Sequence, residues 1–598
     1  MFGEYFRRRP LRDMLAPLPV RAFPWPQPSP ADAAALLRLA ERYRGEDYAS
    51  LTARQYMAFV RTGERGVMER PYFQRRRKLI AAVMGAFVGG SGDDLDAVAD
   101  GLWLICEESS WVISAHNGGE HDGVEARVPR PLPDPNRPYV DLFAAQTAMI
   151  LSLACQLLAD RLDAVTPLLR SRAREEIERR VLAPFENRDD FWWMGVIRRD
   201  LCNWTPWIVS NVMLAACAWL DDRERLAALL TRGCRMLDRY LDGLPEDGGC
   251  DEGMGYWSMA GGAVLDCLDL LERVTDGKLT FWSNEKLGRI LRFPMRLWLG
   301  RGWFANFGDC DAKPEVPGER LQFAGDRLGD AALVAFGARF RADAAAAIAD
   351  TPQFWRLLNG LRPMTADAGE TGPAGDAWLP DLEIRRVCRG GATLVCKGGA
   401  NFGSHNHNDC GSFIFFADGG PVVVDAGNML YTRKTFSEAR YSLWNIRSMY
   451  HNVPMVGDVE QAAGTEYRAR DVVPTPDGLR LDIAGAYPPA AGVKSLRRAF
   501  ALDGGGALTL TDAIALEAAR PVTWVFLLRQ RPRRQGDGIA FGAARVAPDQ
   551  PLDISIEEIP VTDPRMANSF PGSLWRATFT AAAATAHYTT FVIERNQP

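Results

Sequence analysis

Residues 401–428 have the sequence NFGSHNHNDCGSFIFFADGGPVVVDAGN, in which short apolar runs alternate with Gly, Asp and Asn. Runs of about four to eight apolar residues bounded by turn residues are typical of strands. The same pattern of short apolar runs bounded by turn residues recurs on both sides of this stretch, in GATLVCKG, LRLDIAGAY, GALTLTDAI and VTWVFLLR. We therefore predict an antiparallel β domain, a sandwich or stacked sheets, over residues 371–598.

Residues 30–360 show a different pattern, because apolar residues there recur three and four positions apart. That spacing predicts amphipathic helices, most clearly at 93–108, 141–162, 207–220, 260–274 and 328–348. The stretch RPMTADAGETGPAGDAWLPD at 362–381 is rich in Gly, Pro, Ala and Asp and is typical of a linker. Helices followed by strands predict two segregated domains, a helical one at 1–370 and a β one at 371–598.

The composition excludes some classes of protein. The formal net charge of the 598 residues is −5, whereas a nucleic-acid-binding protein is usually basic. An anionic substrate would therefore need a local basic patch. No run approaches the ~20 apolar residues of a membrane span. We expect no nucleic-acid partner and no membrane segment.

The 11 cysteines are scattered from Cys106 to Cys410 without a CxxC pair. Several lie in apolar helical segments, for example Cys155 and Cys217, which favours reduced, buried thiols. The first 20 residues, MFGEYFRRRPLRDMLAPLPV, are partly basic but contain no long apolar run and no evident cleavage site. We therefore expect a cytoplasmic protein.

Histidines are rare in this chain, and three of the six lie close together in the predicted β domain. His405 and His407 are two residues apart, so on a strand they would face the same side. His407, Asp425 and His451 supply two imidazoles and one carboxylate, a set suited to Zn²⁺ or Mn²⁺. The alternative is that all of them are satisfied polar residues at strand ends.

Two polar motifs interrupt the helical region. EDGGCDEGMGYWSMAGG at 246–262 places Glu252 and Tyr256 at a Gly-rich turn that opens a helix. RRDLCNWTPWIVSN at 198–211 places Asn203 and Trp204 at another helix start. Both motifs are candidate parts of a site, with Glu252 and Trp204 as candidate substrate-binding residues. Both could also be ordinary helix starts, in which acidic residues favour the dipole and Asn203 is only a cap.

Two further groups could bind a substrate. Glu108 and Trp111 lie in ICEESSWVISAHNGG, and tryptophans in a cleft often stack on sugar rings. Arg433 and Arg440 lie between the predicted metal ligands, and arginine forks suit sulfate and carboxylate groups. The alternatives are a buried core tryptophan and solvated surface charge.

Four of these segments together resemble the heparinase II/III-like family of polysaccharide lyases. They are SHNHNDCGSFIFFADGGPVVVDAG, the stretch from Tyr441 to Asn452, DEGMGYW, and the Asn-Trp of DLCNW. The resemblance covers most of the chain. It implies a multidomain α+β fold, with an N-terminal (α/α) toroid, an incomplete helical barrel, followed by a C-terminal antiparallel β-sandwich.

The resemblance also implies roles for individual residues. Tyr256 resembles the family's catalytic tyrosine, His405 its catalytic histidine, and Asn203 the asparagine that neutralises a uronate carboxylate. The metal ligands of the family correspond to the three residues proposed above. Some relatives carry a histidine beside the asparagine, where this chain has Trp204.

The function so implied is cleavage of a uronate-containing glycan, such as heparan or chondroitin sulfate, by β-elimination. The partner would be an anionic poly- or oligosaccharide, and a homodimer is left open. One divalent metal ion, Zn²⁺ first and Mn²⁺ or Ca²⁺ as alternatives, would fix the strand that presents His405.

Three rival functions use the same sequence features. An (α/α)-barrel glycoside hydrolase acting on uronate oligosaccharides would pair Glu108 with Asp251 or Glu252 as acid and base. A metal oxygenase of the cupin kind would leave the helical domain unexplained. A glycan-binding protein without activity would not need Asn203, Tyr256 and His405 together.

Overall fold

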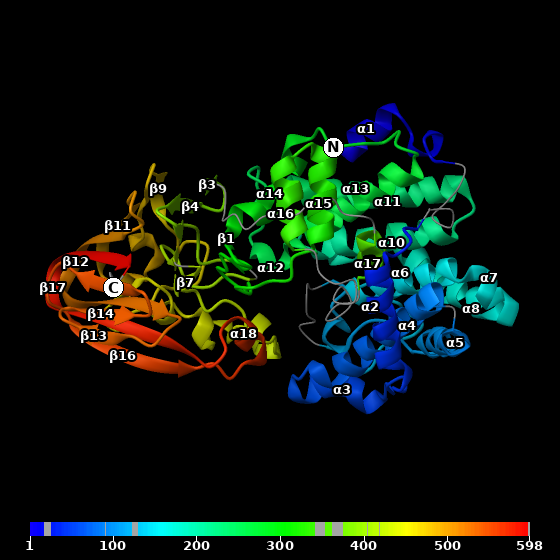
Figure 1. Ribbon diagram of the computed structural model, residues 1–598, viewed down its shortest axis with the longest axis horizontal. Helices are drawn as coiled ribbons and strands as arrows, with labels where there is room; N and C mark the ends of the chain where they lie inside the picture. The colour runs from blue at the N-terminus through cyan, green and yellow to red at the C-terminus, as the bar shows by residue number, and fades with distance from the viewer. Residues whose placement is uncertain are drawn as a thin grey trace. The chain divides into compact units, whose positions relative to one another are not determined.

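The computed structural model describes residues 1–16, 25–89, 91–121, 129–340, 353–361, 375–403, 405–417 and 419–595. The chain forms two compact units (Figure 1). The first contains residues 1–244, 258–284 and 316–368, and the second contains 245–257, 285–315 and 369–598. The predicted boundary at residue 370 lies outside the described residues and stays a prediction.

The first unit is helical. Its helices are α1 (Phe2–Arg8), α2 (Pro30–Arg44), α3 (Ala53–Thr62), α4 (Gly66–Gly89), α5 (Gly92–Cys106), α6 (Leu142–Leu157), α7 (Ala159–Val165), α8 (Leu168–Ile177), α9 (Ala183–Asn187), α10 (Trp204–Trp219), α11 (Arg223–Gly243), α13 (Gly261–Val274), α15 (Gly318–Leu328), α16 (Ala331–Arg339) and α17 (Phe354–Gly360). Four of the five predicted helical segments correspond to helices here. The fifth, 328–348, is helical from Ala331 to Arg339, and its end lies outside the described residues.

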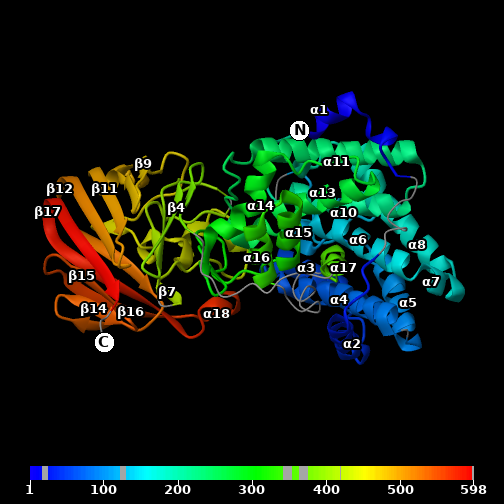
Figure 2. The same ribbon diagram turned by 45° about the horizontal axis from the view of Figure 1, so that its top comes forward.

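The centre of this unit is α10, which packs against α6, α11 and α13 (Figure 2). Nearly every residue of α10 is buried, which explains why its sequence is apolar on all sides. The predicted helix at 141–162 is broken at Leu158, where α6 and α7 are bent by 82°. Among the described helices, none is by itself long and apolar enough to cross a membrane.

The second unit contains a 15-stranded antiparallel sheet in the order β13-β14-β15-β17-β12-β7-β6-β5-β4-β3, with the other five strands paired beside this path. Its strands are β3 (Ala377–Leu379), β4 (Ile384–Arg389), β5 (Ala392–Lys397), β6 (Phe413–Ala417), β7 (Gly420–Val423), β8 (Pro454–Val456), β9 (Arg470–Pro474), β10 (Gly478–Asp482), β11 (Val493–Leu502), β12 (Leu508–Leu528), β13 (Arg533–Gln535), β14 (Gly538–Phe541), β15 (Ala544–Pro548), β16 (Asp553–Pro560) and β17 (Ser573–Arg595).

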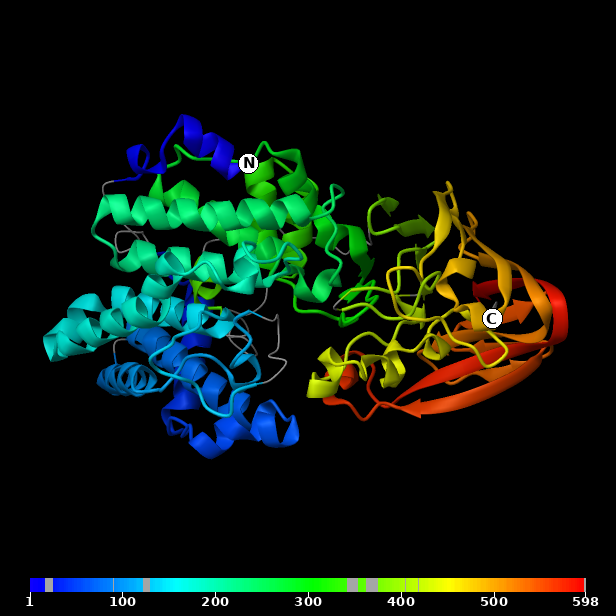
Figure 3. The ribbon, with the colours of Figure 1, turned by 180° about the vertical axis from the view of Figure 1, so that it is seen from behind.

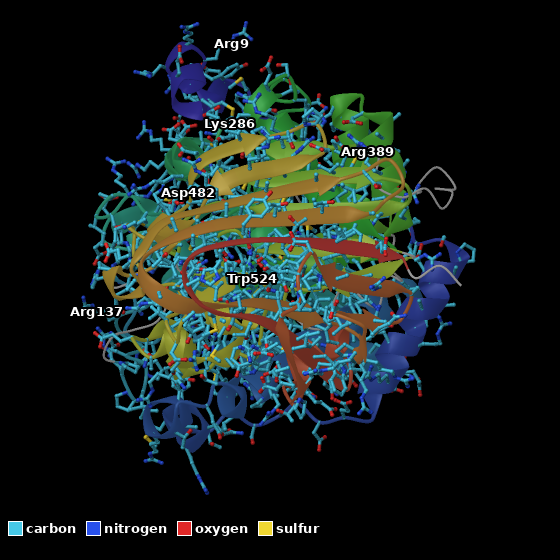
Figure 4. The ribbon with its side chains drawn as sticks, turned by 90° about the vertical axis from the view of Figure 1, so that its left-hand side faces the viewer. Arg9, Arg137, Lys286, Arg389, Asp482 and Trp524 are labelled. Carbon is cyan, nitrogen blue, oxygen red and sulfur yellow. The ribbon has the colours of Figure 1, made fainter. Side chains whose placement is uncertain are left out.

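The two longest strands, β12 and β17, run side by side and pair along most of their length (Figure 3). They pair from Leu508 opposite Ile593 to Leu528 opposite Trp575. Every second residue from Leu508 to Leu516 is buried, as the period of a strand requires. Figure 4 looks onto these strands and labels Trp524, which lies in the buried core of the unit. Helices followed by antiparallel strands confirm the predicted fold class.

Within the described part of the chain, three α-helices belong to the second unit. They are α12 (Gly253–Trp257), α14 (Glu285–Leu297) and α18 (Pro564–Ser569). A two-stranded sheet, β1 (Trp298–Gly300) with β2 (Trp303–Phe304), follows α14. As a result, the Tyr256 motif packs with the strands, although the sequence places it in the middle of the helical region.

Candidate active site

Tyr256 and His405 meet in the second unit. Tyr256 lies on α12, which the indole of Trp257 anchors by donating a hydrogen bond to the carbonyl of Ile290 at 2.8 Å. The rings of Tyr256 and His405 have centroids 4.9 Å apart. The Tyr256 hydroxyl donates a hydrogen bond to the hydroxyl of Tyr431, whose oxygen lies 3.3 Å from His405 Nδ1. The structure thus gathers two phenols and one imidazole that the sequence separates by up to 175 residues.

Both ring nitrogens of His405 face carboxylates. Nδ1 lies 3.0 Å from an oxygen of Asp309, and Nε2 lies 3.6 Å from an oxygen of Glu252. Burial alone lowers the pKa of His405, but Glu252 and Asp309 outweigh it, so that the pKa is raised above its ordinary value. The predicted substrate-binding residue Glu252 is therefore a direct neighbour of the imidazole.

Asp309 links the two histidines of the HxH motif. One of its oxygens is hydrogen-bonded to His405 and also accepts a hydrogen bond from Arg440 at 2.9 Å. The other oxygen lies 3.1 Å from Nε2 of His407. Burial opposes ionisation of Asp309, but hydrogen bonds from both imidazoles and the charge of Arg440 hold its pKa below the usual range. The carboxylate is therefore a fixed anion that orients both rings.

The loop that carries Asp309 is held in place by its backbone. Gly308 has φ +72°, and a Cβ at this position would lie 2.7 Å from the carbonyl oxygen of His405. That close approach allows the Asp309 amide to donate to the same oxygen at 3.0 Å. Asn306 and Asn428 add side-chain bonds, to the carbonyls of Asp425 and Asp309 respectively. These contacts fix the 306–309 turn against both site loops.

His407, Asp425 and His451 form a buried group that could hold a metal ion, because one ligand atom from each lies within 4.8 Å of the others. His407 Nδ1 and His451 Nε2 are buried, and neither has a hydrogen-bond partner among the described residues. The second nitrogen of each ring is hydrogen-bonded to a carboxylate. The partner is Asp309 for His407 and Asp425 for His451. Metal-binding histidines usually have this arrangement, so the residues fit a divalent cation.

The two phenols are buried, and burial shifts their ionisation. Burial raises the pKa of Tyr256 above its ordinary value, and the positive charge of Arg565 is the largest opposing influence. The pKa of Tyr431 is raised by burial as well. Burial therefore favours the protonated form of both side chains, the form in which a phenol can donate a proton.

Asn203 and Trp204 lie in the first unit, at the start of α10. Asn203 occupies the cap position, but its side chain makes no cap hydrogen bond, which weakens the alternative of a simple helix cap. Trp204 is buried, and its ring packs 4.6 Å from that of His116 and 5.1 Å from that of Trp192.

Glu108 and Trp111 also lie in the first unit, and their contacts favour structural roles. Glu108 is buried and accepts hydrogen bonds from Arg75 and Arg76 at 2.7–2.8 Å. The Trp111 side chain is 1% exposed, and its indole donates to the Ile105 carbonyl at 2.9 Å. Such a ring has no free face for a sugar, so the alternative of a core tryptophan is favoured.

The two arginines of the predicted anion patch differ in their environment. Arg433 is exposed, whereas Arg440 is buried and donates to Asp309, Asn406 and Thr435. These bonds favour an internal role for Arg440, that of holding Asp309, over the predicted contact with a glycan sulfate.

Three residues of the cluster, Asp309, Tyr431 and Arg565, had not been predicted. Asp309 lies in NFGDCD at 306–311, where a Gly-Asp turn among Asn and Cys was the available signal. Tyr431 lies just before the arginine-rich stretch that was noted. Arg565 lies more than 100 residues after His451, and no local pattern marks it.

The segment that supplies His405 and the candidate metal ligands also matches a family model. Residues 371–555 match the model described as "Heparinase II/III-like, C-terminal". This segment is a heparinase II/III-like domain. The match confirms the predicted family for this part of the chain. No curated protein sequence matches the chain.

Solved structures of several lyases are similar to the chain that contains this heparinase II/III-like domain. A heparinase III structure is 11% identical, with 95% of this chain and 90% of that chain covered and a TM-score of 0.60. A heparan sulfate lyase from Pedobacter heparinus is 13% identical, with 95% and 88% covered and a TM-score of 0.55. A chondroitin AC lyase from Streptomyces coelicolor, in complex with chondroitin sulphate, is 12% identical, with 100% and 83% covered and a TM-score of 0.54. At these identities the likeness concerns the fold.

Proposed function

We propose that the protein cleaves a uronate-containing glycosaminoglycan of the heparan or chondroitin sulfate kind by β-elimination, with Tyr256 and His405 exchanging the protons. The observation that carries this proposal is the meeting of a buried phenol and an imidazole, with ring centroids 4.9 Å apart, in a heparinase II/III-like protein. The substrate class is taken from the similar structures, which are described as a heparan sulfate lyase and as a chondroitin lyase with chondroitin sulphate.

The reaction needs a base and an acid on one sugar ring. The base removes the weakly acidic proton at C5 of the uronate, and the acid protonates the oxygen that leaves C4. The uronate carboxylate must also be neutralised, because charge develops on it as the C5 proton departs. Asn203 has the amide donor for this role, which its resemblance to the family asparagine implies.

Tyr256 is suited to donate a proton, because its raised pKa keeps the phenol neutral until the leaving oxygen takes the proton. Where the C5 proton and the C4 oxygen lie on opposite faces of the ring, His405 in its neutral form is the base and Tyr256 is the acid. Where both lie on the same face, Tyr256 can serve in both roles if its deprotonated form is accessible.

A metal ion, which we propose to be zinc, would be held by His407, Asp425 and His451. When bound, it would supply positive charge and would fix the loop that bears His405. Elimination requires no water nucleophile, so a closed, structural coordination shell is sufficient.

The main rival function is hydrolysis by a carboxylate pair that includes Glu108. Both oxygens of Glu108 are engaged by the buried guanidinium groups of Arg75 and Arg76, so neither is free to face a glycosidic oxygen as the acid of such a pair must. The contacts of Glu108 therefore favour the lyase.

The test is an absorbance assay with a panel of uronate glycans, because elimination creates a C4–C5 double bond conjugated to the carboxylate. We expect near-ultraviolet absorbance to grow with the wild type, and to fall about 10²–10⁴-fold in rate with Tyr256→Phe and with His405→Ala. Tyr588→Phe is the matched control, because Tyr588 is 64% exposed on β17. Cleavage without new absorbance would indicate hydrolysis, and full activity of Tyr256→Phe would overturn the assignment.

A further inference from the structure

The segment between β16 and β17 forms a buttress beside the two phenols. It contains the short helix α18, and it begins after residue 555, where the matched family model ends. Asp563 caps α18 by accepting from the amides of Arg565 and Met566 at 2.9 and 3.0 Å. Its other oxygen accepts from the amide of Leu430 at 3.0 Å, next to Tyr431. One carboxylate therefore joins α18 to the loop after β7 that carries the second phenol.

A second attachment joins the same segment to the Asp309 loop. The amide of Lys313 donates to Ser569 Oγ at 3.2 Å, and the ring of Phe570 lies 5.8 Å from that of Trp303. These contacts hold the two ends of α18 against different parts of the site. Its side chains are consequently fixed with respect to Tyr431 and to the loop at 303–313.

Arg565 occupies the middle of this arrangement. Its guanidinium makes a two-pronged ion pair with Asp311, with N–O distances of 2.8 and 2.9 Å. The same guanidinium lies over the ring of Tyr431, 5.5 Å from the centroid. Tyr431 in turn accepts the hydrogen bond of Tyr256. A fixed positive charge therefore faces the phenol pair from the side of α18.

We propose that Arg565 is a positioning residue that favours the phenolate form of the Tyr256–Tyr431 pair, so that Tyr256 can act as a base. The catalytic role of Tyr256 in this inference rests on the proposed function. The position of Arg565 beside the two phenols is independent of that function. The proton that leaves Tyr256 goes to solvent before substrate binds, and the phenolate then accepts the C5 proton and returns it to the leaving oxygen. No further reactant is needed for that exchange.

The charges around Tyr256 support this role. Among the described residues, the charged and titratable groups near it are Arg565 with its partner Asp311, Tyr431, Glu252, Asp309, His405 and the Cys310 thiol beside α12. Burial raises the pKa of Tyr256 most, the carboxylates raise it further, and Arg565 lowers it more than any other group. In a poorly solvated site one cation changes the pKa of a neighbour by about 1–3 units.

The consequence for pH dependence has a definite sign. A base acts in its deprotonated form, so the rate of same-face elimination rises as the pH rises through the pKa of the phenol. Removing the positive charge raises that pKa, and the ascending limb of the pH–rate profile moves to higher pH. We expect Arg565→Gln to move it by at least about one unit, and Arg565→Lys to retain part of the effect because the charge remains.

The direct test measures the phenol itself. Difluorotyrosine, whose hydroxyl is more acidic than that of tyrosine, is incorporated at position 256, and its ionisation is followed by ultraviolet absorbance. We expect the titration midpoint to rise by about one pH unit or more in the Arg565→Gln background. Arg389→Gln is the matched control, because Arg389 also makes a two-pronged pair, with Asp376, on β4 (Figure 4).

Loss of the buttress itself must be distinguished from loss of charge. Asp311→Asn keeps the arginine charge but weakens its clamp, and thermal unfolding reports whether each variant is folded. A midpoint that is the same in the Arg565→Gln and wild-type backgrounds, with both proteins folded, would overturn the proposal. If no glycan yields a new absorbance with any variant, the proposed function fails, and the titration still decides the role of Arg565.

Discussion

Two buried Arg–Asp clusters of the second unit differ in how completely they are satisfied. Arg498 donates to both oxygens of Asp512 and to two carbonyls, and the indole of Trp524 donates to the same carboxylate. Around Asp309, by contrast, Arg440 Nε and His407 Nδ1 are buried without a hydrogen-bond partner among the described residues. The first network is complete within the chain, and the second is not.

The difference distinguishes a structural network from a functional one. An unpaired buried polar atom costs free energy, so native proteins retain few of them. Two of them, His407 Nδ1 and His451 Nε2, belong to the group that could hold a metal ion, where a cation would complete their contacts. The core network is expected to contribute to stability, and the Asp309 network to activity and metal binding.

The largest effect is expected where the complete network is broken. Arg498→Met leaves the Asp512 carboxylate buried and unpaired, which costs about 3–5 kcal/mol. Chemical denaturation followed by tryptophan fluorescence should show the loss. Turnover per folded molecule should stay near that of the wild type, and an equal loss of turnover would contradict the distinction drawn here.

A smaller loss of stability is expected when the incomplete network loses its cation. A metal present at 100 times its dissociation constant stabilises a folded protein by about 2.7 kcal/mol, which a chelator removes. Thermal unfolding with and without chelator measures this, and zinc should restore the original melting temperature. His407→Ala is the control and should not respond to chelator. Lost activity at an unchanged melting temperature would indicate a catalytic ion.

The smallest of the three effects is expected for the carboxylate that orients both histidines. Asp309→Asn should lower kcat or metal affinity about 10- to 100-fold, the usual result of removing such a partner. The absorbance assay and metal titration measure the two quantities. Asp376→Asn serves as the control, since Asp376 pairs with Arg385 and Arg389 on β4. Unchanged kcat and metal affinity would remove Asp309 from the site.

The sequence predicted those features that have a local pattern. The spacing of apolar residues was sufficient to predict that α5, α10 and α13 are helices and that β5 and β6 are strands. The HxH motif was sufficient to select His405 and His407 as candidate site residues. The break at Leu158 was missed because the apolar period continues across it. Arg440 was expected at a glycan because its partner Asp309 lies 131 residues away in the chain.

The contacts that the sequence could not reveal are all tertiary. The Tyr431 hydroxyl, the Asp309 carboxylate and the Arg565 guanidinium reach the cluster from three separate segments, and none of them belongs to a recurring motif. Tyr256 was a candidate because of its motif, but its membership in the β-rich unit follows only from packing.

That membership has a practical consequence for dividing the molecule. The chain enters the second unit at residues 245–257 and again at 285–315 before the long β region begins. A fragment cut at residue 371 would keep the HxH loop and lose both the phenol of α12 and the carboxylate that holds the imidazoles. Truncation at the predicted linker would therefore give an incomplete site. A fragment that is meant to keep the site must also include residues 245–257 and 285–315.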